Sequence, residues 1–121
     1  MYMTIKFNLI DAKKFCNKNE VLAKINTNDL IIFAQFKKNV VGYILYSKKQ
    51  NTIKEIFVNE EFRNSKIGTS LVHNIILLNN NVKALNLKET SNFFRNIGFE
   101  FDKNNLKLNP EKLDLKYNFY I

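Results

Sequence analysis

The 121-residue chain is poor in several residue types: it has one cysteine, one proline, three glycines and no tryptophan. A single cysteine cannot form an internal disulfide, which excludes a disulfide-stapled secreted scaffold and favours a reducing cytoplasm. The uninterrupted apolar runs are far shorter than the roughly 20 residues that span a bilayer. The first residues also lack the basic-then-apolar layout of a signal peptide. We therefore expect a cytoplasmic protein without a membrane segment.

Length and composition indicate one folded unit. Hydrophobic residues make up 45% of the chain and charged residues 25%, which is typical of a globular protein. A chain of this size can bury one continuous core, and neither a repeat nor a linker interrupts it. The sequence therefore predicts a single domain that spans residues 1–121.

The net charge of +8 raises nucleic acid as a partner. The basic residues, however, are 17 Lys and only 2 Arg, and they accompany 20 Asn and 13 Ile. Lys, Asn and Ile have AT-rich codons, so this composition indicates drift in an AT-rich genome. A nucleic-acid-binding module would rest on charge alone, and no aromatic-basic motif supports it. Where glycine is this scarce, each remaining glycine is expected where a side chain is not tolerated.

Hydrophobic periodicity predicts an α+β fold with a mixed, mostly antiparallel sheet of about seven strands. The predicted order is β-α-α-β-β-β-α-β-α-β-β. The predicted strands are residues 4–9, 30–36, 40–47, 52–58, 82–87, 99–101 and 113–121. The predicted helices are residues 11–25, in two pieces that begin at Asp11, then 67–78 and 89–97, and they are expected on both faces of the sheet.

Some residues have a specific expected place within these elements. Asn39 is expected to take the left-handed conformation in a hairpin turn over residues 37–39. Gly98 is expected to end the helix of residues 89–97. His73 lies opposite the apolar stripe of the 67–78 helix, so we expect it to face solvent. Cys16 has no His or Cys at ligand spacing, and no metal site is expected.

The stretch of residues 56–71 reads as a strand, a polar loop and the start of a helix. The first amides of a helix have no backbone acceptor and lie at the positive end of the helix dipole. Gly68 would let a phosphate approach this backbone, and Arg63, Lys66, Thr69 and Ser70 would surround it with donors. The spacing therefore predicts an anion site that suits a diphosphate, although any strand-loop-helix has such an end.

The same stretch resembles the central motif of the GNAT superfamily of acyl-CoA N-acyltransferases, V-x-P-x-[YF]-[RQ]-x-x-G-x-[GA]. Five residues match it: Val58, Phe62, Arg63, Ile67 and Gly68. Two further family signatures resemble Val41-Gly42-Tyr43 and the aromatic stretch from Phe93 to Phe99. All three glycines fall at glycine positions of the family, and the element order agrees over essentially the full chain.

The resemblance implies an N-acetyltransferase that uses acetyl-CoA as co-substrate and acts on a primary amine, either a small molecule or a protein amine. It implies that backbone groups of Ile56, Phe57 and Val58 bind the pantetheine arm. The pyrophosphate would lie against Arg63 and the residues that follow it, Asn64, Ser65, Lys66, Ile67, Gly68 and Thr69. A bulge in this strand would splay it from the strand of residues 82–87. A homodimer stays open, and neither nucleic acid nor membrane is expected.

Direct transfer needs a base for the ammonium and an acid for the leaving thiolate. Glu55 is the best-placed base, with Glu89 as the second candidate. The family's usual acid is a Tyr at the position of Phe94, which has no proton to give, so Tyr117 or Tyr120 would have to replace it. Lys66 replaces the motif's first glycine, and a side chain is tolerable there if the residue keeps helical backbone angles. The absence of the Tyr leaves an alternative function, a CoA-binding regulatory protein with weak or no turnover.

Overall fold

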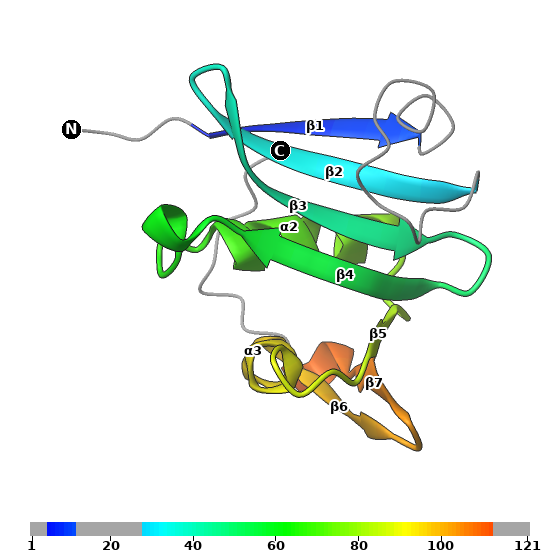
Figure 1. The fold of residues 1–121 in the computed structure, drawn as a ribbon. Coiled ribbons are helices and arrows are strands. Elements are labelled where there is room, and N and C mark those ends of the chain that lie inside the picture. Colours follow the sequence, from blue (N-terminus) through cyan, green and yellow to red (C-terminus); the bar gives the residue numbers. More distant parts are fainter. Residues whose placement is uncertain (1–4, 12–27, 113–121) are drawn as a thin grey trace.

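The computed structural model describes residues 5–11 and 28–112, and Figure 1 draws the remaining residues as a grey trace. The described residues form seven strands: β1 (Ile5–Asp11), β2 (Asp29–Phe36), β3 (Asn39–Ser47), β4 (Thr52–Val58), β5 (Lys83–Leu85), β6 (Phe99–Asp102) and β7 (Asn105–Leu108). They also form two α-helices, α2 (Ile67–Leu78) and α3 (Ser91–Ile97), and two 3₁₀ turns, Glu60–Phe62 and Pro110–Lys112.

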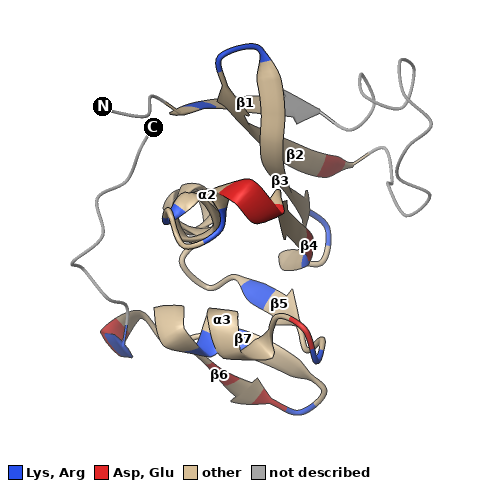
Figure 2. Ribbon diagram, turned by 60° about the vertical axis from the view of Figure 1, so that its left-hand side comes forward, with Lys and Arg blue, Asp and Glu red and all other residues tan. Residues whose placement is uncertain are grey.

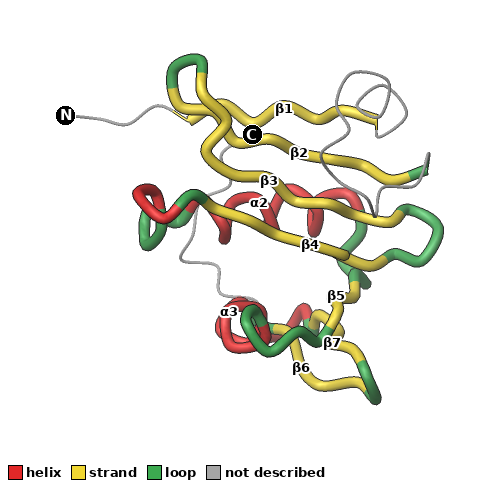
Figure 3. The backbone as a smooth tube through the Cα atoms, viewed as in Figure 1, coloured by secondary structure: helices red, strands yellow, loops and turns green. Residues whose placement is uncertain are grey.

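The seven strands form one sheet in the order β1-β2-β3-β4-β5-β7-β6. Every neighbouring pair is antiparallel except β4 and β5, which are parallel. Parallel neighbours need a long crossover, and here the crossover contains α2. Figure 3 shows β1 to β4 as one broad half of the sheet and the short strands β5, β7 and β6 as the other. The prediction of a mostly antiparallel seven-stranded α+β sheet is confirmed.

The main core lies between the sheet and the two described helices. Its buried residues come from β2 to β7 and from α2 and α3, and include Ile44, Ile53, Leu71, Phe94 and Leu106. Burial of such side chains contributes roughly 1.5–3 kcal/mol each. A smaller cluster on the opposite face of the sheet contains Ile31, Phe33 and Leu45, with Tyr43 packed against it. The helices predicted at residues 11–25 fall almost wholly outside the described residues.

The first hairpin has a tighter turn than predicted. Phe36 pairs with Asn39, so only Lys37 and Lys38 form the turn, and Asn39 is the first residue of β3. The left-handed residue is Lys37, with φ of 58°, and the expectation for Asn39 was wrong. The physical reason is that in a two-residue turn the left-handed residue directly follows the first strand, and here that residue is Lys37.

Two further expectations concern the ends of strands. Asp11, which was expected to cap a helix, is the last residue of β1 and pairs with Leu30, and the helix expected after it lies outside the described residues. The sequence also missed β7, where Leu106 and Leu108 alternate directly after the turn at Lys103. The strand predicted at residues 113–121, which contains Tyr117 and Tyr120, and Cys16 lie outside the described residues.

The expectation that His73 faces solvent was wrong, because its side chain is only 1% exposed. Ser70, one turn before it, and Ile76, almost one turn after it, are buried as well. The helix α2 is therefore covered well beyond its apolar stripe. A helical wheel predicts which face is the most apolar, and tertiary packing decides how many faces are covered.

Candidate active site

A β-bulge in β4 sets the shape of the site. Leu45 pairs with Glu55 and Tyr46 pairs with Ile53, so β4 has one extra residue, Lys54, between these two pairs. Ile53 and Ile56 both contact the main core. The two polar residues between them face the other side of the sheet, where Lys54 reaches Asp29 and Glu55 reaches Tyr43. The bulge thus places two consecutive charged side chains on one face.

Past the bulge, β4 separates from β5. The two strands pair only through Thr52 with Lys83 and Ile53 with Ala84. From residue 54 to Val58, β4 therefore has an edge that β5 does not cover, and Figure 3 shows the strands diverging there. Such an edge presents backbone N–H and C=O groups that can pair with an extended ligand. The splayed geometry expected for this strand is present.

A cleft of about 190 Å³ lies at this divergence. It is lined by residues of β4, by β5 and the loop that follows it, and by α3: Ile53, Lys54, Glu55, Ile56, Leu85, Leu87, Glu89, Thr90 and Phe94. The structure therefore brings both candidate bases, Glu55 and Glu89, to one cleft, although they are far apart in the sequence. Glu55 is half-buried and Glu89 is exposed, so Glu55 lies in the more enclosed position.

Tyr43 is a neighbour of Glu55 that sequence reasoning missed. Its hydroxyl lies close enough to the Glu55 carboxylate to interact with it electrostatically. Burial, together with the negative charge and hydrogen bond of Glu55, raises the pKa of Tyr43 to about 12, so the hydroxyl stays protonated at neutral pH. This proximity follows from strand register: Tyr43 pairs with Phe57, which makes Tyr43 and Glu55 diagonal neighbours.

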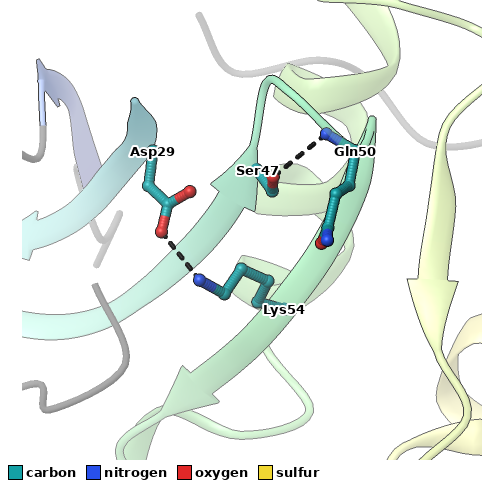
Figure 4. Close-up of polar contacts among 4 residues, drawn as sticks. All are labelled: Asp29, Ser47, Gln50 and Lys54. Carbon is teal, nitrogen blue, oxygen red and sulfur yellow. Dashed lines mark hydrogen bonds and ion pairs between the residues drawn. The ribbon is translucent and has the colours of Figure 1, made fainter. Parts of the chain in front are cut away.

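An ion pair between Lys54 and Asp29 ties the bulge of β4 to β2. The Lys54 ammonium lies 2.9 Å from Asp29, a β2 carboxylate that is 2% exposed. Figure 4 shows the Lys54 side chain reaching from β4 past β3 to Asp29. On β3, the Ser47 hydroxyl accepts a hydrogen bond from the Gln50 amide at 3.1 Å and holds the next turn. Removal of Lys54 would take a charge partner from the buried Asp29 carboxylate, which is destabilising, so this contact holds the bulge of β4 against β2.

The loop after β4 ends in two left-handed residues, Asn64 with φ of 65° and Lys66 with φ of 68°. The condition under which a side chain is tolerable at Lys66, helical backbone angles, is not met. Left-handed angles strain any residue with a Cβ, so glycine would fit this position with less strain. The Arg63 side chain donates from Nε to the Val58 carbonyl at 3.0 Å, and the Ser65 hydroxyl donates to the Phe62 carbonyl.

The loop delivers the chain to the N-terminus of α2. The first hydrogen bond of the helix runs from the Ser70 amide to the Lys66 carbonyl at 3.0 Å. The amides of Ile67, Gly68 and Thr69 precede it, and the helix offers them no backbone acceptor. Because β4 ends beside this helix start, these amides can bind the anionic part of a ligand whose extended part pairs with β4.

Charged side chains add little net attraction at this anion site. Glu60 and Glu61 form the acidic 3₁₀ turn that Figure 2 shows in red beside α2. Their two negative charges balance Arg63 and Lys66 along the same loop. All four side chains are exposed, and solvent screens them. An anion bound at this position would therefore be held mainly by backbone amides and the helix dipole.

The space in front of Gly68 is not open. A Cβ there would lie 3.2 Å from the Phe93 ring and 3.5 Å from the Val58 side chain. The missing side chain therefore lets α3 pack against the start of α2, and the approach of a phosphate to the Gly68 amide stays a prediction. The Gly68 amide itself belongs to the first turn of the helix.

Phe94, an aromatic residue of the cleft, has no hydroxyl. Its side chain lines the cleft and is otherwise buried between the rings of Phe93 and Phe99, at 5.2 and 5.1 Å between centroids. Among the described residues that line the cleft, none carries a hydroxyl on an aromatic ring. The two tyrosines proposed as replacements, Tyr117 and Tyr120, lie outside the described residues.

Residues 5–11 and 28–112 contain no group of three or more His, Cys, Asp and Glu side chains that could hold a metal ion. None of the helices described there is long and apolar enough to cross a membrane.

Comparisons with known proteins assign the chain to a family. Residues 9–109 match the family described as acetyltransferase (GNAT) domain. No curated protein matches the chain.

Several solved structures share the fold. One is a GNAT family acetyltransferase from Elizabethkingia anophelis with acetyl-CoA bound, at a TM-score of 0.64 and 17% identity over 82% of this chain and 78% of that one. Another is the putative N-acetyltransferase YhhK from E. coli bound to coenzyme A, at a TM-score of 0.63 and 13% identity, over 88% of this chain and 98% of that one. Nourseothricin acetyltransferase matches 60% of this chain at a TM-score of 0.52 and 16% identity. The match covers only 51% of that protein.

These likenesses in structure are too distant in sequence to show more than the fold, but the family match covers most of the described residues. It also confirms the enzyme class that the motifs around Gly42, Gly68 and Gly98 indicated. The chain belongs to the GNAT family of acetyltransferases.

Proposed function

We propose that this protein transfers an acetyl group from acetyl-CoA to a primary amine by direct attack. The observation that carries the proposal is the free edge of β4, which leads from the carboxylate of Glu55 to the N-terminal amides of α2. A base at one end and an anion site at the other end of an extended binding edge suit a long ligand with a reactive group and a diphosphate. That some solved relatives hold acetyl-CoA or coenzyme A supports this choice of co-substrate.

The chain's own residues would divide the binding as follows. Backbone groups of Ile56, Phe57 and Val58 would pair with the pantetheine arm along the edge that β5 leaves uncovered. The amides of Ile67, Gly68 and Thr69 would hold the diphosphate, with Asn64, Ser65 and Lys66 shaping the loop. Arg63 would act mainly by tying the loop to Val58.

Acetyl-CoA, when bound, supplies a thioester whose acetyl carbon forms the new bond to nitrogen as its bond to sulfur breaks. Glu55 would accept the proton that the ammonium must lose before its lone pair can attack. A backbone N–H of β4 would stabilise the negative charge that develops on the acetyl oxygen. The attacking nitrogen would release its second proton to water as the carbon–sulfur bond breaks, and the leaving thiolate would take a proton from Tyr117, from Tyr120 or from water. The products are an N-acetylated amine and coenzyme A.

The first test separates binding from turnover. Calorimetry measures coenzyme A binding, and a thiol-release assay measures turnover over a panel of primary amines. We expect Glu55→Gln to lower kcat roughly a hundredfold or more, in the range for loss of a general base, with coenzyme A binding kept. Tyr117→Phe, assayed beside it, tests the proposed acid.

The matched control is Glu111→Gln, because Glu111 is exposed in the turn Pro110–Lys112, away from the cleft. Glu89→Gln tests the second candidate base in the same cleft. A Glu55→Gln variant with wild-type kcat would remove Glu55 from the mechanism. Absence of coenzyme A binding at tens of micromolar would contradict the proposed co-substrate.

Phe94 favours one second candidate, a GNAT-fold protein that binds coenzyme A and regulates a partner with little or no turnover. The residue lines the cleft and cannot protonate a thiolate. Coenzyme A binding without thiol release from any amine tested would support this function over catalysis.

A further inference from the structure

A second cleft shares α3 with the candidate active site but is lined by other residues of the helix. Its volume is about 620 Å³, within the usual range for small-molecule sites. Phe94 lines the first cleft and Phe99 lines the second, and the centroids of these two rings lie 5.1 Å apart. The residues that line the second cleft are Asn92, Arg95, Asn96, Phe99, Glu100, Phe101 and Lys112.

A tight reversal of the chain builds this cleft. The helix α3 ends at Ile97, Gly98 follows with φ of 133°, and β6 begins at Phe99. Because glycine accepts this angle without a Cβ clash, the strand turns back beside the helix that precedes it. Figure 2 shows α3 and β6 side by side in its lower half. The reversal brings Arg95, in the last turn of α3, over the ring of Phe101.

The Arg95 guanidinium stacks on this ring, with its central carbon 4.7 Å from the ring centroid. Among the described residues, no carboxylate forms an ion pair with Arg95. A stacked guanidinium keeps N–H groups in its plane, where they match the paired oxygens of a carboxylate or a phosphate. Arg95 is therefore available for an anionic ligand in the cleft.

The other two charges that line the cleft compensate each other. The Lys112 ammonium lies 2.8 Å from the Glu100 carboxylate, which also accepts a hydrogen bond from the Asn109 side chain at 2.7 Å. The hydrogen bonds from Lys112 and Asn109 lower the pKa of Glu100, so this carboxylate stays charged at neutral pH. The charge of Arg95 is thus the one that the lining residues leave without a counter-ion.

The cleft also offers an apolar surface and further polar groups. The Phe101 side chain is 57% exposed, which is unusual for a large aromatic residue. Asn92 and Asn96 lie three residues before and one residue after Arg95, and both line the cleft. Their side-chain amides can donate hydrogen bonds to the same anion or to a polar group beside it.

We propose that this cleft is a second binding site, for a small aromatic molecule that carries a carboxylate or a phosphate. The ring of the ligand packs against Phe101, and its oxyanion binds the N–H groups of Arg95. The proposal does not depend on acetyl transfer, because none of the residues involved belongs to the β4 edge or to the start of α2.

The test is a titration of the ¹⁵N-labelled full chain, followed by the amide signals in two-dimensional NMR. Phenylacetate and phenyl phosphate are the two aromatic anions, and they distinguish a carboxylate from a phosphate as the preferred group. Inorganic phosphate lacks the ring, and benzyl alcohol lacks the charge. We expect the aromatic anions to shift amides of α3 and β6 with dissociation constants of about a millimolar, as suits such small probes. The two control compounds should shift them much less.

Three variants locate the contacts. We expect Arg95→Gln to weaken binding of the aromatic anions about fivefold, the upper end for an exposed ion pair. Phe101→Leu should reduce their affinity toward that of inorganic phosphate. The matched control is Lys103→Gln, which removes a positive charge from the exposed turn directly after β6, outside the cleft. Its affinities should equal those of the wild type.

The amide spectrum of each variant also shows whether it is folded, so loss of binding is read only where the spectrum is native. Unchanged affinity in a folded Arg95→Gln variant would overturn the proposal. An equal loss in Lys103→Gln would overturn it as well, since net charge alone would then explain the binding. Shifts confined to the amides of Ile67, Gly68 and Thr69 would place the anions at the start of α2 and remove the second site. Failure of thiol release would leave this result unaffected, so the two proposals fail separately.

Discussion

Single residues decide how the loop between β4 and α2 is built. Lys66 occupies a left-handed backbone position at the point where the helix begins. The strain of this conformation comes from the clash between Cβ and the backbone, whatever the rest of the side chain does. Lys66→Gly and Lys66→Ala both lack the ammonium, so the difference in stability between them isolates this backbone strain.

We predict that Lys66→Gly is more stable than Lys66→Ala by roughly 1 kcal/mol, because only glycine escapes the Cβ clash. The greater freedom of glycine in the unfolded state offsets part of the gain. Urea denaturation of the two variants measures the difference in the free energy of unfolding. Equal stabilities would show that the loop relaxes out of the left-handed conformation. The difference does not depend on any contact of the Lys66 ammonium, since both variants remove it.

At the scale of elements, β3 and β4 must approach closely where the pantetheine arm is proposed to bind. Gly42 pairs with Val58, and a Cβ on Gly42 would lie 2.8 Å from the Phe57 carbonyl oxygen. A backbone atom on a paired strand cannot move without distortion of the ladder. The Gly42 position therefore controls the end of β4 that leads into the anion loop.

We predict that Gly42→Ala lowers the free energy of unfolding by roughly 1–3 kcal/mol, the usual cost of overpacking. The matched control is Gly68→Ala, where the nearest contact is the Phe93 side chain at 3.2 Å, which can shift. In that variant the better helix propensity of alanine offsets part of the clash. Denaturant unfolding ranks the two. A Gly42→Ala variant as stable as Gly68→Ala would mean that β3 and β4 tolerate a wider separation.

The elements themselves were predictable to different degrees. The β2–β3 hairpin, β4 and α2 follow from strict local patterns, and the structure has them close to the predicted bounds. In β4, the consecutive polar residues Lys54 and Glu55 between Ile53 and Ile56 were the local signal of a bulge. The strand β7 was missed because four residues after a turn carry too short an alternation to stand out from a loop.

At the scale of the whole molecule, the net charge of +8 does not define a basic surface at the site. The acidic 3₁₀ turn lies directly before the anion loop, and basic residues are dispersed over the hairpin turns and strands, as the blue segments of Figure 2 show. Binding of the proposed co-substrate should instead depend on the helix N-terminus together with the β4 edge.

We predict that coenzyme A stabilises the whole fold. A ligand that binds only the folded state at a hundredfold excess over its Kd adds about 2.7 kcal/mol to the free energy of unfolding. Thermal unfolding with and without coenzyme A measures this as a rise in Tm. Pantetheine, which lacks the diphosphate, is the control ligand and should produce a much smaller rise at the same concentration. An equal rise with both ligands would show that the amides of α2 contribute nothing.

The sequence by itself determined the alternation of apolar residues, the strand-loop-helix around Gly68 and the family, because these depend on residues that are close together in the chain. The tertiary structure alone decided that Glu55 and Glu89 share a cleft, that Phe93 fills the space before Gly68, that His73 is buried, and that Tyr43 meets Glu55. Each of these depends on the register of strands or the packing of helices that are distant in the chain. A change of one residue in register reverses which face a side chain occupies, so local patterns cannot specify such contacts.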